Sequence, residues 1–108
     1  MSDAKKLSQR IVIQIRLALS RQEQDSPAAT HLYNQAKRAG LTQAEIDAAR
    51  SGRSFEARAC AAIRLAKAII EEDAKELLQA QAHAAEFGLC PIEILQVEKL
   101  ALRIKLDG

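Results

Sequence analysis

The sequence predicts an all-α protein of about six helices, packed as one compact orthogonal bundle. Hydrophobic residues make up 48% of the 108 positions and charged residues 28%, and these proportions exclude a disordered chain. Aromatic residues are only 3%, and Ala, Leu, Ile, Gln, Glu, Lys and Arg dominate, which is typical of helices rather than of β-sandwiches or barrels. The length suits a single helical domain over residues 1–108.

Capping signals predict where the first two helices begin and end. The first is expected to start at a cap on Ser2 or Asp3 and to continue to about residue 23. The second starts at Ser26-Pro27, a capping residue followed by a proline at the first helical position, where its missing N–H costs nothing. We expect this helix to end at Gly40.

The next two helices are marked by a capping box and a serine. Thr42 and Glu45 have the spacing at which each side chain bonds the backbone N–H of the other residue, which predicts a short third helix. This helix is expected to stop at Ser51-Gly52. Ser54 is predicted to cap the fourth helix, whose apolar residues recur every three or four positions as far as Ile70.

Two further helices complete the chain. Asp73 and Glu76 have the spacing of a new helix start, which predicts a break in the helix near residues 71–73. The fifth helix is expected to end at Gly88, and Cys90-Pro91 to begin a sixth that continues to about Lys105.

The glycine stops predict which positions need a left-handed backbone. Gly40 and Gly88 each precede a leucine, as expected where a helix closes and the next side chain folds back on its last turn. Gly52 precedes Arg53 instead, and we expect it to tolerate alanine better.

Alternating apolar residues leave a second interpretation open at both ends of the chain. Period two is the pattern of a strand, so residues 10–20 and 99–106 are compatible with N- and C-terminal strands in an α+β fold. The alternating residues are Ile11, Ile13, Ile15, Leu17 and Leu19 in the first segment, and Leu100, Leu102, Ile104 and Leu106 in the second. We favour helices, because an isolated two-stranded ribbon is only marginally stable.

The apolar residues of the first helix surround more than one of its faces. A set this wide exceeds what one side of a six-helix monomer buries. We therefore expect a homo-oligomer that depends on the first or the sixth helix.

The candidate catalytic residues are His31, Tyr33 and Cys90. His31 is close in sequence to the single tyrosine, and Cys90 stands where a helix N-terminus favours a thiolate. The second cysteine, Cys60, lies in an Ala-rich segment typical of a helix interior. Neither cysteine has a partner at metal-ligand spacing and no phosphate-binding loop is present, so we expect no metal and no cofactor.

Charge and hydropathy limit the expected partners. The net charge of +2 is too small to indicate nucleic-acid binding. No apolar segment is as long as a membrane span or is followed by an export cleavage signal, so a cytoplasmic protein without a membrane partner is expected. The sequence does not indicate a small-molecule ligand of any particular class.

Three segments resemble the carboxymuconolactone decarboxylase and alkylhydroperoxidase D-like family. They are residues 35–50 (QAKRAGLTQAEIDAAR), the Ala-rich residues 58–70 and residues 84–97 (AAEFGLCPIEILQV). The resemblance implies an all-α fold that generally works as a homo-oligomer, with sites near the subunit contacts.

The redox centre of that family is missing from this chain. Peroxidase members carry Cys-x-x-Cys, a His four residues later and a Gly eight residues after the His. Counting back from Gly40 places the His position at Leu32 and the two cysteine positions at Ala28 and Asp25. The resemblance therefore implies the fold without its dithiol chemistry.

These observations predict a small self-assembling helical protein with a binding or structural role. One alternative is a non-redox enzyme of the decarboxylase type that uses His31 as acid or base. Another is a helical DNA-binding or regulatory protein, since residues 41–50 resemble the first half of a helix-turn-helix. Against it, the apolar anchors of a recognition helix would fall on Arg53 and Arg58.

Overall fold

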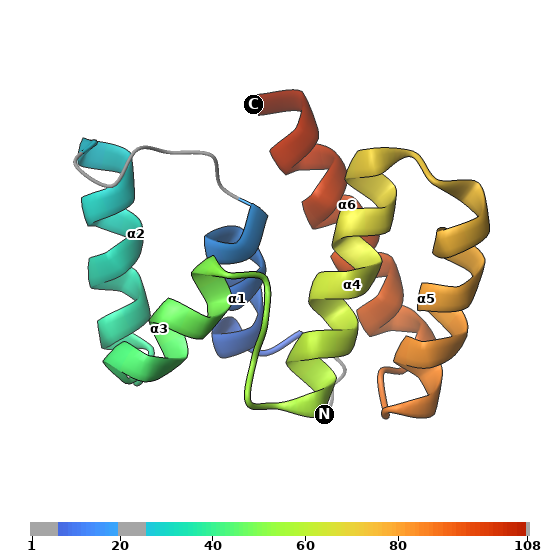
Figure 1. Ribbon diagram of the computed structural model, residues 1–108, viewed down its shortest axis with the longest axis horizontal. Helices are drawn as coiled ribbons and strands as arrows, with labels where there is room; N and C mark the ends of the chain where they lie inside the picture. Colours follow the sequence, from blue (N-terminus) through green and yellow to red (C-terminus); the bar gives the residue numbers. More distant parts are fainter. Residues whose placement is uncertain (1–6, 20–25, 108) are drawn as a thin grey trace.

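A computed structural model describes residues 7–19 and 26–107, and these residues form six helices without a strand (Figure 1). The helices are α1 Gln9–Leu19, α2 Pro27–Arg38, α3 Gln43–Arg50, α4 Ala57–Glu71, α5 Ala74–Glu86 and α6 Pro91–Asp107. The predicted all-α fold is confirmed, and both segments with alternating apolar residues are helical where they are described. None of the helices in these ranges is sufficiently long and apolar to cross a membrane.

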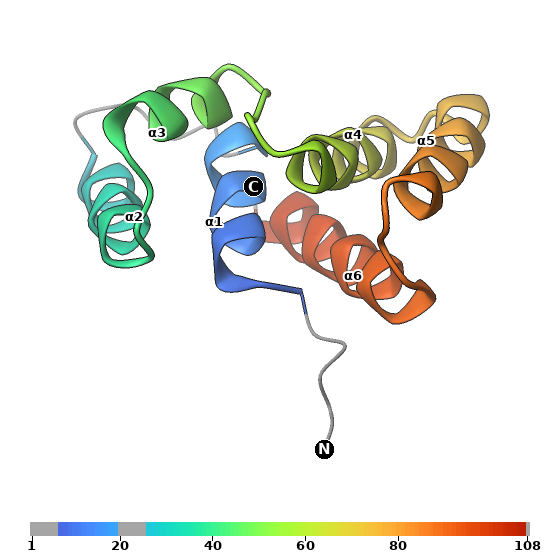
Figure 2. The ribbon, with the colours of Figure 1, turned by 90° about the horizontal axis from the view of Figure 1, so that it is seen from below.

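Helix α1 lies at the centre of the molecule. It packs against α2 and α3 on one side and against α4 and α6 on the other, as Figure 2 shows. Helices α4 and α5 form an antiparallel hairpin, and α6 packs mainly against α4. The molecule therefore has two apolar cores that meet at α1.

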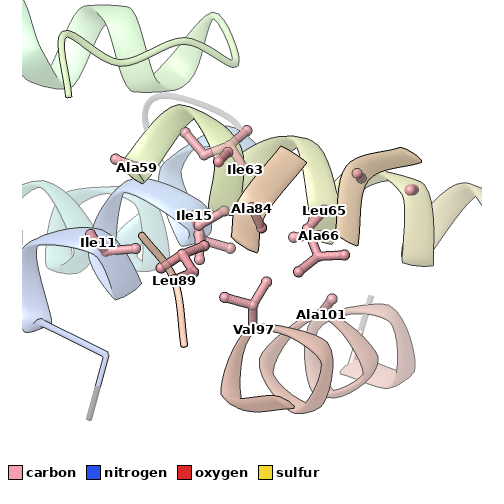
Figure 3. Packing of buried hydrophobic residues seen from close by; sticks show 14 residues of the cluster. Ile11, Ile15, Ala59, Ile63, Leu65, Ala66, Ala84, Leu89, Val97 and Ala101 are labelled. Atoms are coloured by element: carbon pink, nitrogen blue, oxygen red, sulfur yellow. The ribbon is translucent and has the colours of Figure 1, made fainter. Parts of the chain in front are cut away.

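The larger core lies between α1, α4, α5 and α6 (Figure 3). Alanines line much of it, which lets the backbones of these helices approach closely, and larger side chains such as Ile63, Leu65 and Val97 fill the remaining space. The smaller core lies between α1, α2 and α3 and includes Leu41 and Ile46.

The two cores explain why the sequence of α1 alternates. Ile11 and Ile15 belong to the larger core, and Ile13 and Leu17 to the smaller. In a helix, residues two apart point about 200° away from each other, and residues four apart share a face. A helix that is buried on two opposite sides therefore has apolar residues at every second position, which imitates a strand. The wide apolar set of α1 is buried inside the single chain, so it does not require a second copy.

Two predicted helix starts are corrected. Residues 7 and 8 are not helical, and the Ser8 hydroxyl accepts the N–H of Ile11 at 3.2 Å, so α1 starts later than a cap at Ser2 or Asp3 would place it. Those two positions, and the predicted end of this helix near residue 23, lie outside the described residues. Helix α4 starts after Glu56, not at Ser54.

The Ser54 side chain bonds the loop and α1 and does not cap α4. Its hydroxyl accepts the N–H of Glu56 at 3.1 Å and donates to Gln14 Oε1 at 2.5 Å, 40 residues away in sequence. Glu56 then accepts from Gln14 at 3.1 Å and from Arg10 at 3.1 Å. These bonds tie the start of α4 to α1, and Gln14 is buried with its amide satisfied.

The remaining boundaries agree with the predictions. The capping box of α3 is present in both directions, with bonds of 2.7 and 3.2 Å between Thr42 and Glu45. Asp73 caps α5 through the N–H of Glu76 at 3.1 Å. Helix α6 begins at Pro91 and extends two residues beyond the predicted end.

Candidate interaction surface

Helix α6 has two apolar faces, and only one of them is buried. Val97 and Ala101 are fully buried in the larger core, and Ile94, Leu100 and Ile104 pack against it. On the other face lie four apolar side chains that are largely exposed: Ile92 (53%), Leu95 (49%), Leu102 (49%) and Leu106 (85%). We call these four residues, together with the exposed Lys99 between them, the α6 stripe.

The stripe lies on the outside of the molecule. Figure 2 shows that none of the other helices formed by residues 7–19 and 26–107 covers the side of α6 that faces away from α4. Its residues are three or four positions apart along the helix, so they form one continuous row. Other exposed apolar residues, such as Phe55, occur on other segments, where single exposed side chains are ordinary.

The start of α6 is fixed by a buried carboxylate. Glu93, which is 7% exposed, accepts the N–H of Cys90 at 2.9 Å and the Arg58 guanidinium at 2.5 Å. Burial alone would raise the pKa of Glu93, but the Cys90 amide and Arg58 outweigh it and hold this pKa below its usual value. Glu93 thus closes the N-terminus of α6 and joins it to α4.

Polar contacts on both edges hold the rest of α6 against the body of the protein. The N–H of Leu7 donates to Gln96 at 2.6 Å on the side of α1, and Gln81 of α5 donates to Glu98 at 2.8 Å. Near the C-terminal end, Lys105 donates to Glu72. The stripe is therefore presented by a helix that is bound along its length.

The residues singled out from the sequence lie apart from one another. His31 is exposed on α2. Tyr33 is half-buried against the smaller core, and its hydroxyl donates to Gln43 at 2.8 Å. Cys90 occupies the capping position before α6, where its backbone N–H is bound by Glu93. The structure does not bring these side chains together.

Cys60 is held by the loop before α4. Its thiol donates to the carbonyl of Ser54 at 3.0 Å and accepts the N–H of Ser54 at 3.2 Å. Beside it, an open hollow of about 470 Å³ follows the outer side of α4, and Arg64 and Glu76 form a two-bond ion pair at 2.6 and 3.1 Å there. The Cys60 thiol, the Arg64 guanidinium and the Glu76 carboxylate therefore all have hydrogen-bond partners within the protein.

No family model, no curated protein and no solved structure matches this chain.

The sequence predicts an oligomer that depends on the first or the sixth helix, but it does not identify the residues of the α6 stripe. The alternation over residues 99–106 is compatible with a strand as well as with the favoured helix. In a helix, the same alternation marks two opposite apolar faces, as α1 demonstrates.

Proposed function

We propose that this protein is a non-enzymatic helical module that associates with a second copy of itself through the α6 stripe. The observation that carries the proposal is the contrast between α1 and α6. Both helices have apolar residues on two opposite faces; α1 buries both faces within the chain, whereas α6 buries one.

The exposed face supplies a driving force for association. Removing apolar surface from water is worth about 25 cal/mol for each Å². A row of exposed apolar residues on one helix face is typical of a protein interface, and single exposed side chains are not. The row here contains one charged residue, Lys99. Since α6 is anchored along its length, little conformational entropy is lost when this face is covered.

The positions of the candidate catalytic residues support a binding role over catalysis. His31 is exposed on α2, and the Tyr33 hydroxyl is engaged by Gln43. We propose in addition that the chain is related to the carboxymuconolactone decarboxylase and alkylhydroperoxidase D-like family and lacks its redox centre. We also propose a cytoplasmic location, which the free thiols of Cys60 and Cys90 support.

The test is the mass of the protein in solution over a range of concentrations. Light scattering or sedimentation equilibrium should give more than the 11.8 kDa of one chain at tens of micromolar. The double variant Leu95→Asp/Leu102→Asp should be a folded monomer with an unchanged helical circular dichroism spectrum.

Phe55→Asp is the matched control, because Phe55 is 70% exposed in the loop before α4 and lies outside the stripe. It should associate like the parent protein. A parent chain that stays monomeric at these concentrations, or a double variant that associates as before, would overturn the proposal.

A further inference from the structure

The spacing of the α6 stripe is that of a two-helix seam. Ile92, Leu95, Lys99, Leu102 and Leu106 follow one another at intervals of three, four, three and four residues. This is the a/d pattern of a heptad repeat, with Ile92, Lys99 and Leu106 at a and the two leucines between them at d. The buried residues of α6, such as Val97 and Ala101, lie on the opposite side of the helix, so a second helix can pack against the seam without displacing any residue from the core.

We infer that two copies of this chain pair their α6 helices parallel and in register, and that Lys99 is the polar seam residue that sets this register. The inference rests on the proposed self-association and specifies how the two α6 helices are oriented and aligned. It requires that each stripe residue contacts the same residue of the second copy.

Charge complementarity favours the parallel arrangement. Glu98 and Arg103 lie at the g and e positions that border the seam, and in a parallel pair g of one helix meets e of the next heptad on the other. Two-fold symmetry then gives two Glu98–Arg103 ion pairs between the copies. In an antiparallel pair e meets e, so Arg103 would face Gln96 or the second Arg103 instead of Glu98.

Glu98 also has a contact within its own chain. Gln81 of α5 donates to Glu98 Oε2 at 2.8 Å, so the carboxylate lies on the α5 side of α6. The residue types agree as well, because a β-branched residue at a (Ile92) with leucine at d (Leu95, Leu102) favours two parallel strands.

Lys99 makes the seam weaker and more specific. In this register the two Lys99 ammonium groups face each other across the seam, which costs stability. A single lysine at an a position nevertheless fixes register and oligomeric state, because a shifted pairing would bury the ammonium against leucine. In the proposed register each ammonium lies beside the Glu98 carboxylate of the second copy.

Self-crosslinking tests the orientation directly. In a Cys60→Ser/Cys90→Ser background, Leu102→Cys should form a disulfide-linked dimer under mild oxidation, because a parallel pair brings position 102 of each copy within disulfide range. Phe55→Cys, an exposed position outside the stripe, should stay a monomer on a non-reducing gel. A dimer that crosslinks only when Ile92→Cys and Leu102→Cys chains are mixed is antiparallel and would overturn the inference.

Two sets of variants test the roles of the seam and border residues. Lys99→Leu should lower the dissociation constant roughly tenfold or more, or raise the number of copies, because the polar position is gone. In the Lys99→Leu background, where no ammonium lies beside position 98, Arg103→Glu should raise the dissociation constant about tenfold, and Glu98→Arg/Arg103→Glu should bring it back to within about threefold of the Lys99→Leu value. Arg53→Glu, the same charge change on the exposed loop before α4, should have no effect.

The results separate the inference from the proposed function. If Leu95→Asp/Leu102→Asp abolishes association while Leu102→Cys fails to crosslink with itself, the stripe is the interface and the parallel register is wrong. The parallel register is also wrong if the charge swap does not restore binding. If the parent chain is a monomer, the stripe does not bind a second copy, and both the proposed function and the parallel register are overturned.

Discussion

Four residues in the described part of the chain hold a left-handed backbone, and only three of them are glycine. Gly40, Gly52 and Gly88 have φ of 92°, 82° and 95°, and Glu72 has φ of 56°. At each site the last turn of a helix closes in the same way, with an N–H two residues past the helix bonded back to its final turn. Non-glycine residues pay a steric cost in this conformation.

The three glycines should respond alike to alanine. The sequence predicts greater tolerance at Gly52, but its φ of 82° is as left-handed as those of Gly40 and Gly88, so the backbone gives no reason for a difference. Each of Gly40→Ala, Gly52→Ala and Gly88→Ala should lower the free energy of unfolding by about 1–2 kcal/mol in urea titrations. A negligible loss at all three would mean that these helix ends tolerate a side chain without strain.

Glu72 gives the opposite prediction. Replacing it by glycine should stabilise the protein relative to Glu72→Ala by about 1 kcal/mol, although glycine is ordinarily the worse residue near a helix. Both variants lose the Lys105 contact, so their difference in urea midpoint isolates the backbone conformation. If Glu72→Ala is the more stable of the two, the left-handed end of α4 is contradicted.

Among the elements, the joint between α4 and α6 depends on one carboxylate. Glu93 bonds Arg58 and the Cys90 N–H, and its pKa is lowered from 4.5 despite its burial. A carboxyl whose pKa is lower in the folded state stabilises the fold above its unfolded pKa, and this contribution is lost as the pH falls through the folded value.

We therefore expect Glu93→Gln to cost about 1–2 kcal/mol at pH 7 and progressively less below pH 4.5. The measurement is urea unfolding of the parent and the variant over this range. Glu86→Gln, an exposed carboxylate on α5, should stay within about 0.5 kcal/mol of the parent throughout. A difference between Glu93→Gln and the parent that stays constant with pH would exclude ionised Glu93 as the cause.

The elements also show which parts of the fold the sequence could predict. Caps and stops that act within one turn, such as Thr42 with Glu45 or Gly88 after α5, were predicted because their bonds join residues close in sequence. The start of α4 was not, because Ser54 accepts the N–H of Glu56 in the loop and bonds Gln14 across 40 residues, and the second contact cannot be inferred from local sequence. Nor could the sequence decide which helix lies at the centre, since α1 and α6 have similar alternation and differ only in what packs against them.

At the scale of the whole molecule, burial is unevenly distributed. Helix α1 joins two cores and is covered on both sides, whereas α6 closes the larger core and leaves its outer face in water. The radius of gyration of 13.3 Å is that of a compact chain of this length, so the outer face of α6 is not the product of an open arrangement. A second copy would give α6 the two-sided burial that α1 has within one chain.

If folding and association are coupled in this way, thermal stability must depend on protein concentration. A tenfold rise in concentration adds about 1.4 kcal/mol to the stability of a dimer, which for two chains of this size raises Tm by about 3 °C. Calorimetry over a hundredfold range should show this slope for the parent chain, and a higher Tm at every concentration for Lys99→Leu. The Leu95→Asp/Leu102→Asp variant, which keeps the core face of α6, should melt at one temperature throughout. A parent Tm that does not change with concentration would show that the outer face of α6 contributes nothing to the stability of the native state.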